Sequence, residues 1–199
     1  MLELKHTDSD FEAGCDEAGR GCLAGPVVAA AVILPNDYTN KILNDSKQVS
    51  EKKRDLLRIE IEKEAISFGV GILDNKVIDK ENISRSSFLA MHAALDQLKT
   101  KAEFILVDGN RFIPYHKIPH KCMVKGDALF LNIAAASILA KTYRDQIMFK
   151  LHEEFPHYGW SKNKGYPTKL HRDGIRKYGP TKYHRMSFTL LPKQIDIIF

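Results

Sequence analysis

The sequence contains few cysteines, no long apolar run and no secretory leader. Its three cysteines, Cys15, Cys22 and Cys122, form no CxxC pair, which argues against both a disulfide framework and a zinc site. No stretch approaches the roughly 20 apolar residues that span a bilayer, and the N-terminus lacks the basic-then-apolar order of a signal peptide. We therefore expect a cytoplasmic protein without a membrane segment, with the cysteines as small buried residues.

The composition that is present is ordinary for a globular protein, with 44% hydrophobic and 28% charged residues among 199. The charge, however, is unevenly distributed along the chain. Residues 161–186 contain eight Lys or Arg and one acid, while the net charge of the whole chain is +5. A basic segment joined to a mildly acidic body indicates a polyanion contact beside an acidic site. A solvated basic surface explains the charge equally well.

The apolar pattern predicts an α/β domain with a mixed sheet and a helical C-terminal extension. Strands are expected at 11–16, 26–34, 66–73, 103–108 and 121–124, and helices at 51–65, 84–99, 129–153 and 167–177. Fewer than ten residues, several of them glycine, separate the first two strands. This spacing favours an antiparallel hairpin with a wide connection.

Four acidic residues occupy positions suited to a metal site. Asp16 and Glu17 are adjacent at the end of the first expected strand, Asp108 ends an apolar strand, and Asp127 precedes the longest helix. Ligands of α/β proteins usually bind at strand ends, and hard cations prefer carboxylate oxygens. Two such ions would hold the attacking and leaving oxygens of a phosphodiester. The alternative for each acid alone is a helix cap or a surface charge, but the apolar surroundings of Asp16 favour the metal site.

Two further motifs are compatible with nucleic-acid binding. The glycines of Gly19-Arg20-Gly21 allow close backbone approach to a ligand, although most such triplets are plain turns. Tyr166 lies among basic residues, where an aromatic ring can stack on a base or sugar, or else simply fill the core or surface. His171 and His184 can act as acid or base groups, but we expect them to be surface or phosphate-contacting histidines.

Taken together, these motifs resemble the ribonuclease HII family, the type 2 ribonucleases H. The matching stretches follow the family's order between residues 12 and 188. They are Gly14-Cys-Asp-Glu-Ala-Gly-Arg-Gly21, Asp45-Ser-Lys47, Val107-Asp-Gly109, Lys125-Gly-Asp127, Ala134-Ala-Ala-Ser-Ile-Leu-Ala-Lys141, Arg144-Asp145, Gly165-Tyr-Pro-Thr168 and His184-Arg-Met-Ser-Phe188. The resemblance implies an RNase H-like fold, a mixed five-stranded sheet flanked by helices. Residues 1–155 would form the catalytic domain, with residues 156–199 as a basic helical extension packed on it.

The resemblance also implies an activity and assigns residues to it. The activity would be endonucleolytic cleavage of the RNA in RNA–DNA hybrids and at single ribonucleotides in duplex DNA, leaving 3′-hydroxyl and 5′-phosphate ends. The catalytic metal, Mg²⁺ or Mn²⁺, would be held by Asp16, Glu17, Asp108 and Asp127. The expected nucleic-acid contacts are Gly19, Arg20 and Gly21 at the ribose 2′-hydroxyl, Tyr166 at the sugar past the RNA–DNA junction, Ser46 and Lys47 at phosphates, and in addition Lys164 and Arg185.

One position departs from the family pattern. Where the family commonly has His-Lys-Gly-Tyr, this chain has Asn163-Lys164-Gly165-Tyr166. Asparagine can form hydrogen bonds but cannot carry a positive charge or transfer a proton. A charged phosphate contact from residue 163 is therefore not expected.

Two alternative functions and several partners complete the expectations. A ribonuclease HIII-like hybrid nuclease is less favoured, because that family usually has an extra N-terminal domain and only about ten residues precede the first expected strand. A non-catalytic nucleic-acid-binding module is also less favoured, because acids in a binding groove weaken affinity for phosphate. We expect a monomer that binds RNA–DNA hybrids and ribonucleotide-containing duplex DNA. The apolar tail 189–199 would either pack on the body or contact a replication clamp.

Overall fold

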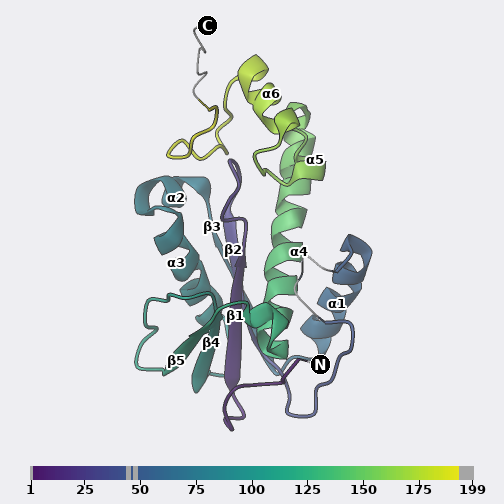
Figure 1. Cartoon of the computed structure of the whole chain (residues 1–199), viewed down its shortest axis with the longest axis vertical. Coiled ribbons are helices and arrows are strands. Elements are labelled where there is room, and N and C mark those ends of the chain that lie inside the picture. Colours follow the sequence, from purple (N-terminus) through teal and green to yellow (C-terminus); the bar gives the residue numbers. More distant parts are fainter. Residues whose placement is uncertain (1, 44–45, 47–48, 193–199) are drawn as a thin grey trace, which may run out of the picture.

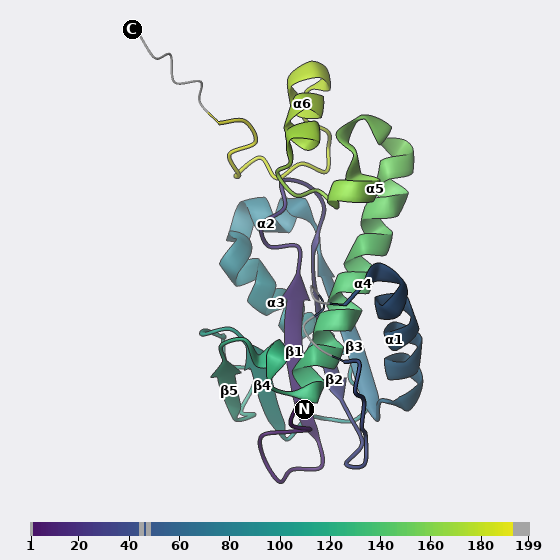
Figure 2. The ribbon, with the colours of Figure 1, turned by 45° about the vertical axis from the view of Figure 1, so that its right-hand side comes forward.

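The computed structural model describes residues 2–43, 46 and 49–192, and a five-stranded sheet forms its centre (Figures 1 and 2). The strands are β1 (Glu12–Ala18), β2 (Val27–Ile33), β3 (Ser67–Leu73), β4 (Phe104–Asp108) and β5 (His120–Met123). Their order is β3-β2-β1-β4-β5, so β1 lies in the middle. β2 pairs antiparallel with both β1 and β3, whereas β4 is parallel to β1 and β5. The predicted mixed sheet and the predicted hairpin are both confirmed.

Helices cover both faces of the sheet, with α2 and α3 on one face and α1 and α4 on the other (Figure 1). The α-helices of the described chain are α1 (Glu51–Glu64), α2 (Asn75–Glu81), α3 (Ile83–Leu95), α4 (Leu131–Glu154), α5 (Trp160–Asn163) and α6 (Lys169–Tyr178). Within the part of the chain described here, none of these helices combines the length and the apolar composition that crossing a membrane requires.

The helix α2 was not predicted. It begins after Asp74, whose side chain accepts a hydrogen bond of 2.9 Å from the backbone N–H of Val77. An aspartate in this position is a favourable N-cap, but only Val77 and Ile78 give the helix apolar character. The predicted helix at 167–177 also begins later than expected, because Thr168 rather than Pro167 caps α6.

The strand β1 alternates between two hydrophobic cores. Ala13 and Cys15 face the core formed with α2 and α3, so Gly14 and Asp16 face α4. A Cβ atom on Gly14 would lie 2.2 Å from the carbonyl carbon of Asn132, so only glycine allows α4 to lie this close to β1. This close contact brings the first turns of α4 next to Asp16.

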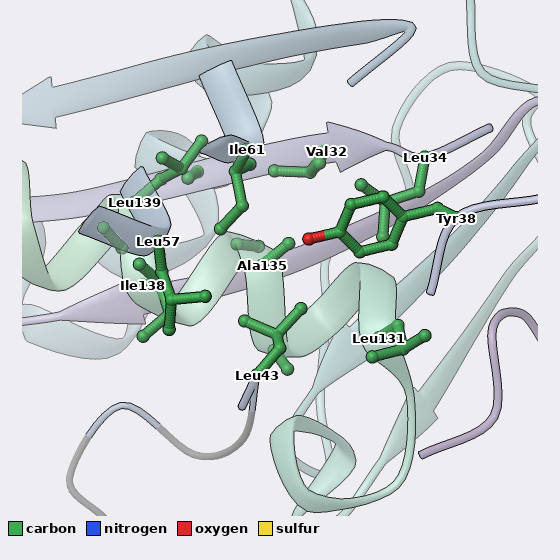
Figure 3. Close-up of a cluster of buried hydrophobic side chains, with 14 of the residues drawn as sticks. Val32, Leu34, Tyr38, Leu43, Leu57, Ile61, Leu131, Ala135, Ile138 and Leu139 are labelled. Atoms are coloured by element: carbon green, nitrogen blue, oxygen red, sulfur yellow. The ribbon is translucent and has the colours of Figure 1, made fainter. Parts of the chain in front are cut away.

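The core on the α4 side combines the sheet with α4 and α1. Figure 3 shows Val32 from β2 beside Ile61 of α1 and Ala135 and Ile138 of α4. The small side chains of α4 in this interface are buried, and its alanines let the helix approach the sheet closely. The position of α4 relative to β1 is therefore set by packing on both sides.

The C-terminal segment lies beyond the upper end of the sheet in Figure 1, where α5 and α6 pack against the end of α4. It is attached to the β1–β2 connection by backbone hydrogen bonds. Leu23 N–H donates to the Gly165 carbonyl at 2.8 Å, and Arg185 N–H donates to the Leu23 carbonyl at 2.8 Å. The segment is therefore joined to the glycine-rich connection. The division of the chain at residue 155 stays a prediction.

Candidate active site

Asp16 and Asp108 are brought together by the parallel pairing of β1 and β4. The register of these strands ends at the pair Cys15 and Val107, so the two aspartates follow directly on neighbouring strands. Burial of the Asp16 carboxyl group raises its pKa well above the ordinary value, and the charges of Glu17 and Asp108 raise it further. These three carboxyl groups therefore lie close enough to repel one another.

Asp127 is held beside Asp108 by a backbone contact. The Asp108 carboxylate accepts a hydrogen bond of 2.8 Å from the N–H of Gly126. Gly126 begins the short 3-10 helix η1 (Gly126–Ala128), which contains Asp127. Asp127 is itself buried. The structure therefore places a fourth acidic residue near Asp108, at the C-terminal end of β4.

Ser137 connects Asp16 to the loop before α1. It lies close enough to Asp16 to oppose the rise in the pKa of that carboxyl group, and its hydroxyl donates a hydrogen bond of 2.9 Å to Ser46. Ser46 is buried, with only 4% of its surface exposed, and its hydroxyl contacts Ser137 in the interior. This position argues against the expected direct phosphate contact by Ser46. Lys47, the other residue expected there, lies outside the described residues.

The donor set suits a hard divalent cation. All four predicted ligands are carboxylates, which favour Mg²⁺ or Mn²⁺ over softer metals. A cation beside Asp16 would remove the repulsion from Glu17 and Asp108 that raises its pKa. Among the described residues, no three His, Cys, Asp or Glu side chains are drawn together closely enough to hold an ion. One Glu17 oxygen instead accepts a hydrogen bond of 2.9 Å from Arg20.

The buried side chain of Arg185 holds the turn at Gly19-Arg20-Gly21 through hydrogen bonds to its backbone. The guanidinium of Arg185 is fully buried and donates to the backbone carbonyls of Arg20, Gly25 and Pro26 at 2.8, 3.1 and 3.0 Å. Its burial argues against the direct nucleic-acid contact that we expected, since all its charge is directed at the protein backbone. A cationic side chain in a basic segment can satisfy carbonyls as well as phosphates, and composition does not distinguish the two.

Arg144 is a second buried guanidinium under the same turn, and sequence analysis gave it no role. It donates to the Ala24 carbonyl at 3.3 Å, and its Nε lies 2.8 Å from where a Cβ on Gly19 would be. Its guanidinium carbon is also 5.9 Å from the centre of the Tyr166 ring. Arg144 therefore lies between the glycine turn and the loop of Tyr166.

Tyr166 borders the glycine turn with an exposed ring. Its side chain is 42% exposed, and its Cε1 lies 3.8 Å from where a Cβ on Gly21 would be. A methyl group on Gly21 would therefore touch the tyrosine ring, so this glycine and the exposed ring are close neighbours. Arg20, which is half exposed, lies in the same turn.

Lys164 does not reach this surface. Its ammonium group donates to the Ser161 carbonyl at 2.6 Å and lies 3.4 Å above the ring of Phe149. Burial lowers its pKa, although Asp145 and Glu51 counteract the shift. The expected nucleic-acid contact by Lys164 is therefore not supported.

Asn163, the departure from the family pattern, braces the loop of Tyr166. Its amide donates to the Tyr158 carbonyl and accepts from the N–H of Gly165, both at 2.8 Å. Both hydrogen bonds are internal, so the neutral amide holds the loop without a positive charge.

Comparison with known proteins agrees with this geometry. The ribonuclease HII family model matches residues 13–191. Ribonuclease HII of Parabacteroides distasonis is 63% identical over 189 residues, covering 95% of each chain. Ribonuclease HII of Christiangramia forsetii is 63% identical over 187 residues, covering 94% of each chain. At this coverage the similarity extends from the glycine turn through the acidic positions to the C-terminal segment.

Solved structures show the same fold at lower identity. Ribonuclease H2 from Pyrococcus horikoshii OT3 superposes with a TM-score of 0.76 at 24% identity, covering 90% of this chain and 94% of that one. RNase HII from Archaeoglobus fulgidus, solved in complex with PCNA, gives 0.74 at 25% identity, covering 94% and 98%. Bst-RNase HIII in complex with Mn²⁺ gives 0.69 at 20% identity, covering 90% of this chain and 67% of that one. The predicted RNase H-like fold is confirmed.

Proposed function

This chain belongs to the ribonuclease HII family and is a ribonuclease H, and from that premise we propose its substrates and chemistry. It cleaves the RNA strand of RNA–DNA hybrids endonucleolytically and incises duplex DNA on the 5′ side of a single embedded ribonucleotide. The observation that carries the proposal is the ribonuclease HII match over residues 13–191, together with the parallel pairing of β1 and β4 that places Asp16 beside Asp108. Neither a ribonuclease HIII-like enzyme nor a non-catalytic module is favoured by relatives at this identity.

The acidic residues form the centre of the proposed mechanism. Asp16, Glu17, Asp108 and Asp127 would hold Mg²⁺ or Mn²⁺, which when bound supplies an activated water and neutralises charge at the scissile phosphate. Asp16 lies on the central strand, with acidic neighbours on both β1 and β4, so it is the best placed to be shared between ions. Cleavage of the bond to the 3′-oxygen leaves a 3′-hydroxyl on one fragment and a 5′-phosphate on the other.

The glycine turn would recognise the ribose 2′-hydroxyl. The Arg20 carbonyl points to the buried Arg185, so the N–H of Gly21 in the same trans peptide points the opposite way. The Gly19 carbonyl accepts from the N–H of Cys22 at 3.4 Å, which turns the N–H of Arg20 in the same manner. Two backbone donors are thereby directed away from the interior, where they suit an oxygen ligand. The 2′-hydroxyl is the group that distinguishes RNA from DNA.

Tyr166 would contact the nucleic acid directly, and two buried guanidinium groups would attract it from a distance. The exposed Tyr166 ring can stack on the deoxyribose past the RNA–DNA junction. Arg144 and Arg185 place two positive charges under the turn, and these favour a polyanion even without touching it.

The cellular setting is also part of the proposal. We place the enzyme in the cytoplasm as a monomer that removes ribonucleotides during DNA replication and repair. The RNase HII of Archaeoglobus fulgidus forms a complex with PCNA, and the tail 189–199 of this chain would make an analogous clamp contact. Residues 193–199 of that tail lie outside the described residues.

A panel of three duplexes tests the substrate proposal. An RNA–DNA hybrid and a DNA duplex with one ribonucleotide should both be cut in Mg²⁺ or Mn²⁺, and an all-DNA duplex should not be cut. A chelator should abolish both activities, and end mapping should show 3′-hydroxyl and 5′-phosphate termini. Cyclic-phosphate ends, or cleavage that persists in chelator, would refute the proposed chemistry. Cutting of the hybrid alone would support the ribonuclease HIII-like alternative.

A further inference from the structure

Three buried aromatic residues lie behind the loop that carries Tyr166. Trp160, His171 and His184 are at most 1% exposed. The Nε1 of Trp160 and the Nε2 of His184 lie 2.9 and 3.1 Å from the Nε2 of His171. The Nδ1 of His171 lies 3.0 Å from the Tyr166 carbonyl oxygen.

These contacts determine where the protons of both histidines lie. The indole N–H of Trp160 only donates, so the Nε2 of His171 accepts and its proton lies on Nδ1, which donates to the Tyr166 carbonyl. The Nδ1 of His184 accepts from the backbone N–H of Thr181 at 2.8 Å, so its proton lies on Nε2 and shares the single lone pair of the His171 Nε2 with the indole N–H. Both imidazoles are therefore neutral, each with a single tautomer.

The loop that receives this hydrogen bond requires support. Lys164 and Gly165 have φ angles of 49° and 82°, and this left-handed backbone is unfavourable for a residue with a side chain, such as Lys164. The Tyr166 carbonyl accepts from the N–H of Thr168 at 2.8 Å as well as from His171. The Thr168 hydroxyl in turn accepts from the backbone N–H of His171 at 3.3 Å. The imidazole thus ties the loop to the first turn of α6.

We propose that His171 is a positioning residue for the discrimination of single ribonucleotides, because its Nδ1–H fixes the Tyr166 carbonyl and with it the direction of the Tyr166 ring. This rests on the proposed role of Tyr166 at the RNA–DNA junction. The Tyr166 Cε1 lies 3.8 Å from the Cβ position of Gly21, so a rotation of this peptide moves the ring relative to the glycine turn. His171 is fully buried and acts through Tyr166 rather than on the substrate.

Two substitutions of His171 separate its two hydrogen bonds. Asparagine places its amide near the position of Nδ1, so His171→Asn keeps a donor for the Tyr166 carbonyl. Glutamine places its amide near the position of Nε2, so His171→Gln keeps the partner of Trp160 and loses the donor to Tyr166. Tyr158→Phe is the matched control, because it removes a hydrogen bond of 2.7 Å to the Gly179 carbonyl in the same region without touching the His171 bond to Tyr166.

The kinetic readout is kcat/KM for a single-ribonucleotide duplex divided by kcat/KM for a long hybrid. Tyr166→Ala sets the scale, and His171→Gln should lower this ratio similarly, by roughly tenfold. His171→Asn and Tyr158→Phe should keep the ratio within about twofold of wild type, even if their melting temperatures fall. Equal losses in the Asn and Gln variants, or an unchanged ratio in the Gln variant, would overturn the proposal. A wild-type enzyme that does not cut the single-ribonucleotide duplex would instead refute the proposed function.

A second readout does not depend on activity. Nitrogen-15 NMR of the folded wild-type protein should show His171 protonated on Nδ1 and His184 protonated on Nε2 at pH 7.5. The Nδ1 signal of His171 should stay in place in Tyr158→Phe, which leaves the hydrogen bond to the Tyr166 carbonyl intact. A His171 proton on Nε2 would overturn the proposal, whatever the enzyme cleaves.

Discussion

A methyl group at Gly19 and one at Gly21 would meet different surroundings. At Gly19, φ is 95° and a Cβ would lie 2.8 Å from Arg144 Nε and 2.9 Å from the Pro26 carbonyl. At Gly21, the nearest atom is Tyr166 Cε1 at 3.8 Å. The first glycine is therefore required for folding of the turn, whereas the second has room for a methyl group in contact with the Tyr166 ring.

We predict that Gly19→Ala and Gly21→Ala have separable effects. Gly19→Ala should lower the free energy of unfolding by at least about 1–2 kcal/mol, because of its left-handed φ and its close contacts. Gly21→Ala should change that free energy by less than about 0.5 kcal/mol and yet reduce cleavage of a single-ribonucleotide duplex. Urea unfolding and kcat/KM measure the two effects. A Gly21→Ala enzyme with wild-type kcat/KM would show that close approach to Gly21 is not needed.

The positions of Asp16 and Asp108 at neighbouring strand ends could be predicted at this scale, whereas the partners of several polar side chains could not. Asp16 and Asp108 end apolar strands, and strand ends are where ligands bind. Ser46, Lys164 and Arg185 have side chains that suit phosphate contact, but in the structure they bind protein groups instead. Because the same donors serve a carbonyl and a phosphate, only the three-dimensional arrangement distinguishes them.

At the scale of elements, the C-terminal segment depends on two histidines that must stay neutral. Burial, and to a smaller extent the charge of His171, lowers the pKa of His184 to about 4, and a backbone contact with Thr181 partly opposes the shift. The pKa of His171 is also lowered by burial, with smaller effects from Arg172 and Arg144. A second proton on either ring would replace an acceptor of this cluster with a donor.

We therefore predict that the protein loses stability as the pH falls from about 6.5 to about 4. In this window the unfolded chain binds protons at His171 and His184 that the folded state excludes, so the free energy of unfolding decreases with decreasing pH. The loss from His184 alone should reach up to about 3 kcal/mol. Urea unfolding at several pH values measures it. His184→Gln should flatten this dependence, whereas a substitution of the exposed His116 should not; an equal flattening by both would contradict the assignment.

The elements themselves were largely predictable because each has a clear apolar pattern. β2 is buried along its whole length and α4 carries a continuous run of small residues, and both patterns survive in the fold. The pattern did not reveal α2, which is short and mostly polar. It also could not show that His171 and His184 are buried, because their environment is built by Trp160 and Tyr158 from another part of the chain.

For the molecule as a whole, the proposed site lies where the C-terminal ends of β1 and β4 approach the C-terminal segment (Figure 1). The acids come from β1, β4 and η1, while Tyr166 comes from the segment after α5. The β1–β2 connection joins the two parts through the hydrogen bonds of Leu23 and Arg185. In the proposed function, the acidic body and the basic segment recognised in the sequence are the two sides of one site. Their contact could not be predicted, because it depends on buried hydrogen bonds.

The most direct test of the central claim is cleavage by Asp16→Asn. Asparagine keeps the size of the side chain and removes the charge, so cleavage of a single-ribonucleotide duplex in Mg²⁺ should fall by at least about a thousandfold. Binding of the hybrid should persist, because removing a negative charge does not weaken contact with phosphate. Asp37→Asn is the control, since Asp37 is exposed and follows β2 at the opposite end of the sheet. Near-normal turnover by Asp16→Asn would contradict the account.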